Sequence, residues 1–187
     1  SMEEAEALST KMGIMVKGGI FRCFGSSQHI KNKYGTGYEI EVKVSKMNTD
    51  QQKEMAVKFG IHGGPELIHF EKCKELMKTH GIDEFLIGEL RHDGLGADLY
   101  KEAFEQKGMV SYQNFMIWLN VEIHGLRIIH YLVEEFQSLE VLEHYNDYFK
   151  MRVPRGEKSI GFVFGLIEDQ KADFGIAEYS VSQTTLE

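Results

Sequence analysis

A strict alternation of apolar and polar residues, running from Tyr38 to Val44, constrains this chain more than any other local pattern. The apolar members are Tyr38, Ile40, Val42 and Val44, and the polar members are Glu39, Glu41 and Lys43. Successive side chains of a strand point to opposite faces, so this period of two predicts a strand with one face on a core and one in water. The run from Phe149 to Val153 alternates in the same way, and Pro154 is expected to end it because proline lacks the ladder donor.

The last part of the chain predicts a helix followed by a strand. From Glu157 to Phe174, helical spacing puts a set of apolar residues on one stripe, with Gly175 as a C-cap: Ile160, Val163, Phe164 and Ile167. Residues Ile176 to Ser182 then predict a strand. We expect the stripe to face the sheet, which gives an α+β fold: a small sheet with helices on one face.

The first and second predicted sheet strands are separated by a long segment with helical periodicity, from about residue 48 to residue 138. Helical spacing recurs in three ranges, Pro65 to His80, Leu95 to Gln106, and Ser111 to Phe136. Pro65 suits a first-turn position and Ser111 an N-cap. The third range has a wide apolar face, which either packs on the sheet and its sister helices or forms a docking surface for another part of the protein or the headgroup layer.

The N-terminal region predicts an antiparallel β-hairpin and a short helix. Met12 to Lys17 and Ile20 to Gly25 are strand-like runs joined by a Gly-Gly pair, which supplies the positive φ angles of a tight turn. Residues Ser27 to Tyr34 then predict a capped helix that stops at Gly35. The following glycines predict a linker.

Composition indicates an ordinary folded domain with reduced thiols. The chain is 42% hydrophobic and 27% charged, and its net charge of -8 offers no basic field for nucleic acid, so a nucleic-acid partner is not expected. Its two cysteines, Cys23 and Cys73, favour a reducing compartment over a disulfide framework. The most apolar stretch, Phe115 to Val133, is interrupted by charged and polar residues, so we expect a soluble chain with no membrane-spanning helix.

The sequence nominates no catalytic or cofactor-binding residues. It lacks a G-x-x-x-x-G-K-[ST] loop and contains no Gly-Lys pair, so the usual cradle for nucleotide phosphates is missing. The glycine-rich stretch from Gly60 to Pro65 is interpreted as a plain loop. No set of titratable groups converges in the sequence as an active site would require.

One metal hypothesis concerns a predicted helix. His69, Cys73 and His80 share one helical face, and His62 could supply a fourth zinc ligand. Structural zinc sites usually pair their ligands as C-x-x-C or H-x-x-x-H, however, and these residues do not. A buried cysteine with solvent-facing histidines explains the same pattern, and we favour that interpretation.

Four separated motifs carry a resemblance to a known family. They are the opening Ser1 to Leu8, the junction Phe24 to Tyr38, the tripeptide Val153 to Arg155, and the closing Tyr179 to Glu187. The first resembles the tail of a nucleotide-binding domain in the ABCA subfamily of ATP-binding cassette transporters, which move lipids. The others resemble its junction with the cytosolic regulatory domain that follows, and that domain itself.

The resemblance covers roughly residues 1–44 and 140–187, whereas the best-known family members have a much shorter segment in place of residues 48–138. It implies that residues 1–34 are the tail of a nucleotide-binding domain and that residues 38–187 are a regulatory domain with a helical insertion. The catalytic histidine would lie immediately before Ser1, and ATP and magnesium would bind in the parent's nucleotide-binding domain.

The resemblance therefore implies a non-catalytic segment on the cytosolic face of a multi-pass membrane protein. Its partners would be other cytosolic domains of the same transporter, and lipid would be handled only by the parent. Phe162, which points off the predicted helical stripe, is the main candidate for contact with a partner domain, and Tyr179 and Trp118 are further candidates. The alternative is an independent small-molecule or zinc-sensing module.

Overall fold

The computed structural model describes residues 22–25, 37–61 and 66–184. These residues form two compact units. The first spans Lys46–Ile123, and the second combines residues 22–25 and 37–45 with residues 124–184. Helix α7, Tyr112–Phe136, begins in the first unit and ends in the second.

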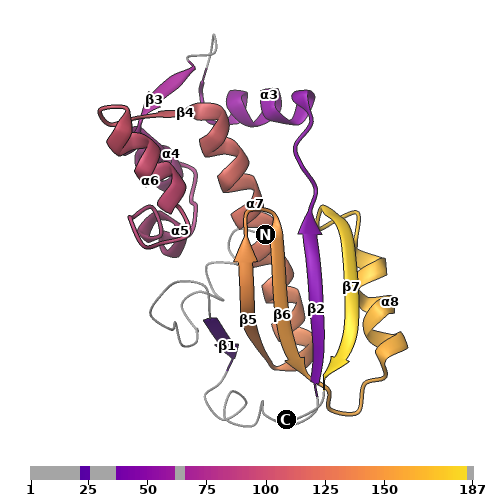
Figure 1. The fold of residues 1–187 in the computed structure, drawn as a ribbon. Coiled ribbons are helices and arrows are strands. Elements are labelled where there is room, and N and C mark those ends of the chain that lie inside the picture. Colours follow the sequence, from indigo (N-terminus) through magenta and orange to yellow (C-terminus); the bar gives the residue numbers. More distant parts are fainter. Residues whose placement is uncertain (1–21, 26–36, 62–65, 185–187) are drawn as a thin grey trace. The chain divides into compact units, whose positions relative to one another are not determined.

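The second unit is built on a five-stranded antiparallel sheet with the strand order β1-β5-β6-β2-β7 (Figure 1). The strands are β1 Arg22–Gly25, β2 Gly37–Val44, β5 Ser138–Tyr145, β6 Tyr148–Pro154 and β7 Ile176–Thr184. In register, Ile40 of β2 lies between Met151 and Val181. The predicted strands at 38–44, 149–153 and 176–182 are confirmed, and β6 ends at Pro154 as expected.

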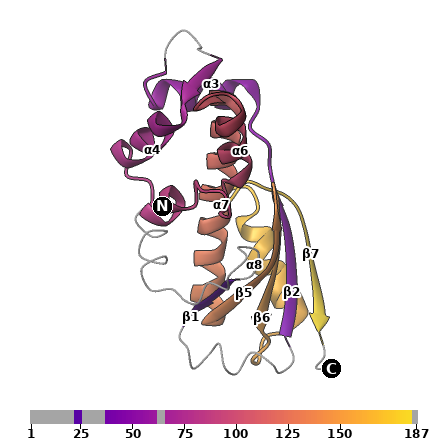
Figure 2. The same cartoon turned by 60° about the vertical axis from the view of Figure 1, so that its left-hand side comes forward.

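Helices cover one face of this sheet, as the α+β prediction requires. Figures 1 and 2 show α8, Ile160–Gln170, and the C-terminal half of α7 on the same side. The alternating side chains Tyr38, Ile40, Val42 and Val44 are at most 2% exposed. The apolar period of two therefore produced the core face that it predicted, and Ile40 and Val42 lie beside Ile128 and Leu132 of α7 and Ile167 of α8.

The boundaries and orientation predicted for α8 were partly wrong. The helix begins after Ser159, whose Oγ accepts a hydrogen bond from the Phe162 N–H (3.2 Å), and it ends at Gln170. Gly175 adopts a φ of 64° in the turn that follows, so it is not the immediate C-cap. Val163 and Ile167 are buried, but Ile160 and Phe164 are 38% and 39% exposed. A single i, i+4 pair suffices to pack this short helix on the sheet.

Strand β5 was not predicted, although the predicted end of the preceding helix at Phe136 is confirmed. Gln137 has a φ of 71°, which turns the chain directly from α7 into β5. Strand β1 pairs with β5, with Phe24 opposite Leu139. The predicted hairpin partner at 12–17 and the predicted helix at 27–34 lie outside the described residues.

The first unit is largely helical, as predicted for the insertion, but it also contains a two-stranded ribbon. Its elements are α3 Thr49–Lys58, β3 Leu67–His69, α4 Phe70–Thr79, α5 Glu84–Gly88, α6 Ala97–Glu105, β4 Met109–Ser111 and the start of α7. Strands β3 and β4 are antiparallel, with Ile68 opposite Val110. The helix predicted from Pro65 begins instead at Phe70, because 67–69 is a strand; Pro65 itself lies outside the described residues.

The elements missed in this unit carry little hydrophobic periodicity. Helix α3 buries none of its side chains, so its sequence carries no apolar periodicity that would predict a helix. Its signal is a capping box in which Asn48 and Gln51 exchange hydrogen bonds of 2.8 and 2.9 Å. The predicted cap of α7 is present, since Ser111 Oγ accepts from the Asn114 N–H at 3.2 Å.

The wide apolar face of α7 is buried, as the first of the two alternatives for it required. The buried members of the predicted face are Phe115, Leu119, Leu126, Ile129 and Phe136, each at most 5% exposed. Trp118 and Val133 are intermediate. Among the residues that the structure describes, no helix has both the length and the apolar character needed to cross a membrane.

Candidate interface on helix α8

Among the described residues of the second unit, three exposed large apolar side chains lie together on α8. Ile160, Phe162 and Phe164 are 38%, 48% and 39% exposed. Gly161 and Gly165 lie on the same helix, and apart from the neighbouring residues and the helix's own backbone, a Cβ at either position would meet no described heavy atom within 4 Å. We call this set of five residues, 160, 161, 162, 164 and 165, the α8 surface.

The geometry of the α8 surface suits a second element of secondary structure. At 100° per residue, Gly161 and Gly165 lie opposite the buried pair Val163 and Ile167, with Phe162 on one flank and Phe164 on the other. A glycine pair one turn apart lets another backbone approach closely, and flanking aromatic rings supply contact area. Contiguous exposed apolar groups of this kind usually mark interaction sites.

Tyr179, a predicted interface residue, supports α8 from strand β7. Its hydroxyl donates a hydrogen bond to Glu168 Oε2, and this bond raises the pKa of Tyr179 to about 12. Its ring lies 6.0 Å from that of Phe164, and the Lys171 ammonium is 5.9 Å from the ring centroid. Tyr179 therefore stabilises the side of the α8 surface on which Phe164 lies.

On the sheet face opposite the helices, two carboxylates are paired with hydroxyl groups or with basic side chains. Glu41 accepts hydrogen bonds from the hydroxyls of Tyr148 and Ser180, and these bonds lower its pKa. Glu39 lies 3.7 Å from Lys150 and 3.5 Å from Arg152. The donors and acceptors come from neighbouring strands, so this network stabilises strand register and leaves α8 as the stronger candidate for contact.

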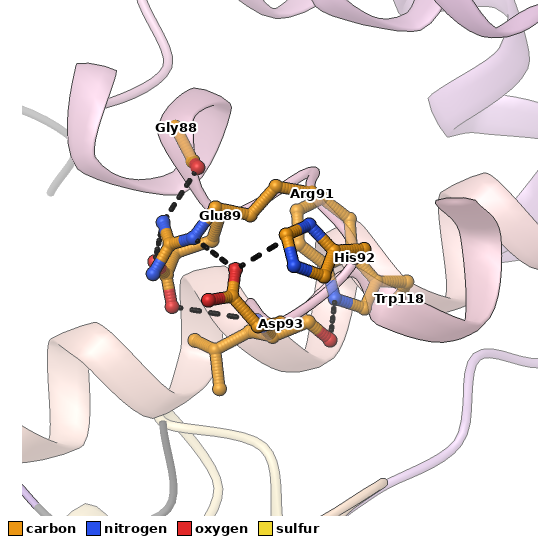
Figure 3. A network of polar contacts seen from close by, with 7 residues as sticks. Gly88, Glu89, Arg91, His92, Asp93 and Trp118 are labelled. Atoms are coloured by element: carbon orange, nitrogen blue, oxygen red, sulfur yellow. Dashed lines mark hydrogen bonds and ion pairs between the residues drawn. The ribbon is translucent and has the colours of Figure 1, made fainter. Parts of the chain in front are cut away.

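Trp118, the third predicted interface residue, uses its polar atom within the first unit. Its Nε1–H donates to the Leu95 carbonyl at 3.1 Å, and Leu95 belongs to the loop between α5 and α6 (Figure 3). The Glu89 carboxylate is the buried centre of that loop and is 1% exposed. It pairs with Arg91 at 2.6 Å and accepts from the Leu95 N–H at 3.3 Å.

The remaining hydrogen bonds of this network join Arg91 to the end of α5 and to another residue of the same loop. Arg91 Nη1 also donates to the Gly88 carbonyl, and its Nε donates to Asp93 Oδ1, both at 2.8 Å (Figure 3). The hydrogen bond from Arg91 lowers the pKa of Asp93. Because each charged group faces a partner in the same loop, we assign the network a structural role in holding Trp118 and the α5–α6 connection.

The residues of the metal hypothesis have separate surroundings. Cys73 is fully buried, and this burial raises the pKa of its thiol to about 12. His80 packs edge-on against the Phe59 ring at 4.6 Å, and His69 sits in β3 just before α4. Within the described ranges, no three His, Cys, Asp or Glu side chains are placed to hold a metal ion; His62 lies outside them.

Most of the α8 surface was not predicted from the sequence. Phe162 was predicted to contact a partner, but Ile160 and Phe164 were predicted to lie in the core, and the two glycines were not considered. The available signal was the spacing of Gly161 and Gly165 within an otherwise apolar helix. A solvated helix with this composition is unusual, because exposed helix faces normally carry polar residues.

Residues 107–183 match the family model of the ABCA1-like, C-terminal R1 regulatory domain. This range begins after α6, so it leaves out α3 to α6, and it includes β4, α7, β5, β6, α8 and all but the last residue of β7. Over these residues the chain is therefore similar to the C-terminal regulatory domain of the ABCA transporters.

Individual relatives agree with this assignment. The human phospholipid-transporting ATPase ABCA3 is 27% identical over 187 residues, which is 100% of this chain and 7% of that protein. The human retinal-specific phospholipid-transporting ATPase ABCA4 is 52% identical over 50 residues, 27% of this chain and 2% of that protein. Human ATP-binding cassette sub-family A member 2 is 40% identical over 86 residues, 44% of this chain and 3% of that protein. No solved structure matches the chain.

Proposed function

We propose that this chain is a non-catalytic regulatory and assembly segment of an ATP-driven lipid transporter, acting on the cytosolic face of the membrane. Its task is to associate with the corresponding regulatory domain in the other half of the transporter and so couple the two nucleotide-binding domains. The observation that carries this proposal is the α8 surface, which lies within the range matched to the regulatory domain.

Contact with a partner domain would bury apolar area that α8 leaves exposed. Phe162 and Phe164 bury only part of their rings in the isolated chain. Covering the remaining apolar area would contribute about 25 cal/mol per Å². Tyr179 and the Ser159 cap already hold the helix in place, so contact would cost little additional conformational entropy.

The test compares two exposed phenylalanines. We expect Phe162→Ala to weaken binding to a purified regulatory segment from the parent's other half by roughly tenfold or more, the effect of losing a central aromatic contact. Phe104→Ala is the matched control, because Phe104 is 83% exposed and lies in the first unit. Both variants should keep Tm within a few degrees of the unmodified chain.

Isothermal titration calorimetry gives the affinities. If both variants lose affinity equally, or if neither loses affinity, the contact lies away from α8. The non-catalytic part of the proposal is tested separately, by ATP hydrolysis measured across successive purification steps. Activity that tracks the folded chain would refute it.

A further inference from the structure

The first unit contains two copies of one structural pattern. In each, a helix is followed by a three-residue strand, and a second helix begins at the very next residue: α3, β3 and α4 in one copy, and α6, β4 and α7 in the other. The two strands pair antiparallel, and the Phe70 N–H donates to the Gly108 carbonyl at 2.8 Å at one end of the ribbon. The Tyr112 N–H donates to the Glu66 carbonyl at 3.2 Å at the other end.

The burial pattern of the strand and the second helix repeats with the same register, whereas the first helices differ, because α3 buries no side chain and α6 buries Leu99 and Ala103. An offset of 42 residues relates three pairs: Ile68 and Val110, Cys73 and Phe115, and Met77 and Leu119. Each pair is buried, with exposures of 9% and 0%, 0% and 0%, and 0% and 0%, respectively. Two helix–loop–helix elements joined through a short ribbon between their loops, as Figure 1 shows for β3 and β4, have the architecture of paired EF-hands.

The donor set of the second loop does not fit calcium. An EF-hand loop spans twelve residues, with oxygen ligands from alternate positions, a glycine at the sixth and a bidentate glutamate at the twelfth. If Gly108, with a φ of 89°, takes the glycine position, the closing position is Asn114 and the opening position is Ala103. The only carboxylate from 103 to 114 is Glu105.

The first loop is no better suited. The offset that relates Val110 to Ile68 puts Lys72 at the closing position, so an ammonium group stands where calcium requires a carboxylate.

The second loop is also too short. Helix α6 runs to Glu105 and leaves only residues 106–108 before β4, which is too short a connection to wrap around a cation.

Glu102 occupies the place where a cation would join the two helices of the second copy. From α6, its Oε1 accepts from the Ser111 N–H at 2.8 Å and from Gln106 Nε2 at 3.0 Å. Its Oε2 accepts from Asn114 Nδ2 at 3.3 Å, and Asn114 lies in the first turn of α7. One carboxylate thus links the end of α6, strand β4 and the start of α7.

We infer that residues 46–123 form an EF-hand-type pair that does not depend on calcium, in which the Glu102 carboxylate does the joining that a bound cation does elsewhere. This module holds one helix arrangement whatever the calcium concentration. It extends the proposed function by excluding calcium as the input to this segment, but it does not depend on that proposal, because it rests only on the first unit.

The experiment uses the full 187-residue chain and two glutamate variants. Glu102→Ala should speed amide exchange at Ser111 at least tenfold and lower Tm by roughly 4–8 °C, since it leaves two side-chain donors and one backbone donor unpaired. Glu105→Ala is the matched control on the same helix and should change neither. Equal behaviour of the two variants would overturn the role of Glu102.

A calcium titration tests the other half of the inference. Calcium chloride raised to about 5 mM, above the weakest EF-hand dissociation constants, should leave Tm and the amide resonances of residues 103–114 unchanged. EDTA should likewise have no effect. A calcium-dependent rise in Tm, or saturable shifts confined to 61–72 or 103–114, would show that the loops bind the cation and would overturn the inference.

Discussion

Gly125 on α7 provides a sharp test of how the second unit is packed. A Cβ at this position would lie 2.3 Å from Cζ and 2.7 Å from Cε2 of Phe149, far inside the usual carbon–carbon separation of about 3.5–4.0 Å. The Phe149 ring has no room to retreat, because it is 3% exposed and the His144 ring stacks on it at 3.8 Å. Alanine at 125 must therefore displace either the helix or the ring.

The magnitude follows from two opposing effects. Overpacking a well-filled core costs about 1–3 kcal/mol, and the rigid ring places Gly125→Ala near the upper value. Replacing glycine by alanine inside a helix contributes about 1 kcal/mol in the other direction. We expect a net loss of about 2 kcal/mol, which lowers Tm by roughly 4–8 °C for a chain of this size.

Gly165→Ala is the matched control, since it makes the same change in α8 where no described heavy atom lies within 4 Å of the new Cβ. It should stabilise the chain by about 0.5–1 kcal/mol through helix propensity alone. Urea denaturation of both variants measures the difference. Phe149→Leu should also reduce the cost of Gly125→Ala in a double-mutant cycle. If Gly125→Ala were as stabilising as Gly165→Ala, the close approach of α7 to Phe149 would be refuted.

Two further predictions concern α8 and the polar sheet face. Ile167→Ala should cost roughly 2–5 kcal/mol, whereas Phe164→Ala should cost only about 1 kcal/mol because its ring is 39% exposed; thermal denaturation giving the reverse order would mean that α8 is rotated. Glu41 has a folded-state pKa below its ordinary value of 4.5, so its hydrogen bonds contribute stability above the unfolded pKa that is lost as pH falls through the folded pKa. Glu41→Gln should therefore lower the free energy of unfolding by less than about 1 kcal/mol near pH 6, and this loss should shrink toward about pH 3. The control Glu178→Gln should show no such trend. A loss of stability that is independent of pH would refute the assignment of these hydrogen bonds to the ionised Glu41 carboxylate.

The sequence alone determined those elements whose partners are implied by their own periodicity. Alternation in 38–44 and 149–153 requires an apolar face on a core, and Pro154 cannot donate to a ladder, so these strands and the end of β6 were predictable. The Ser111 cap was predictable for a similar reason, because a hydroxyl before a helix satisfies a backbone donor locally. The family motifs likewise predicted the similarity to the ABCA regulatory domain that residues 107–183 show.

Only the tertiary structure decided which side of α8 is covered. Helical spacing allows Ile160, Val163, Phe164 and Ile167 to share one stripe, but how wide a stripe is buried depends on the shape of the sheet beneath it. The sheet covers Val163 and Ile167 and leaves the two flanking residues half-exposed. In the first unit, β3 and β4 are too short to show periodicity, and each exists because the other supplies its hydrogen bonds. The linking role of Glu102 depends on that same pairing, since only the folded chain brings the carboxylate to the Ser111 amide.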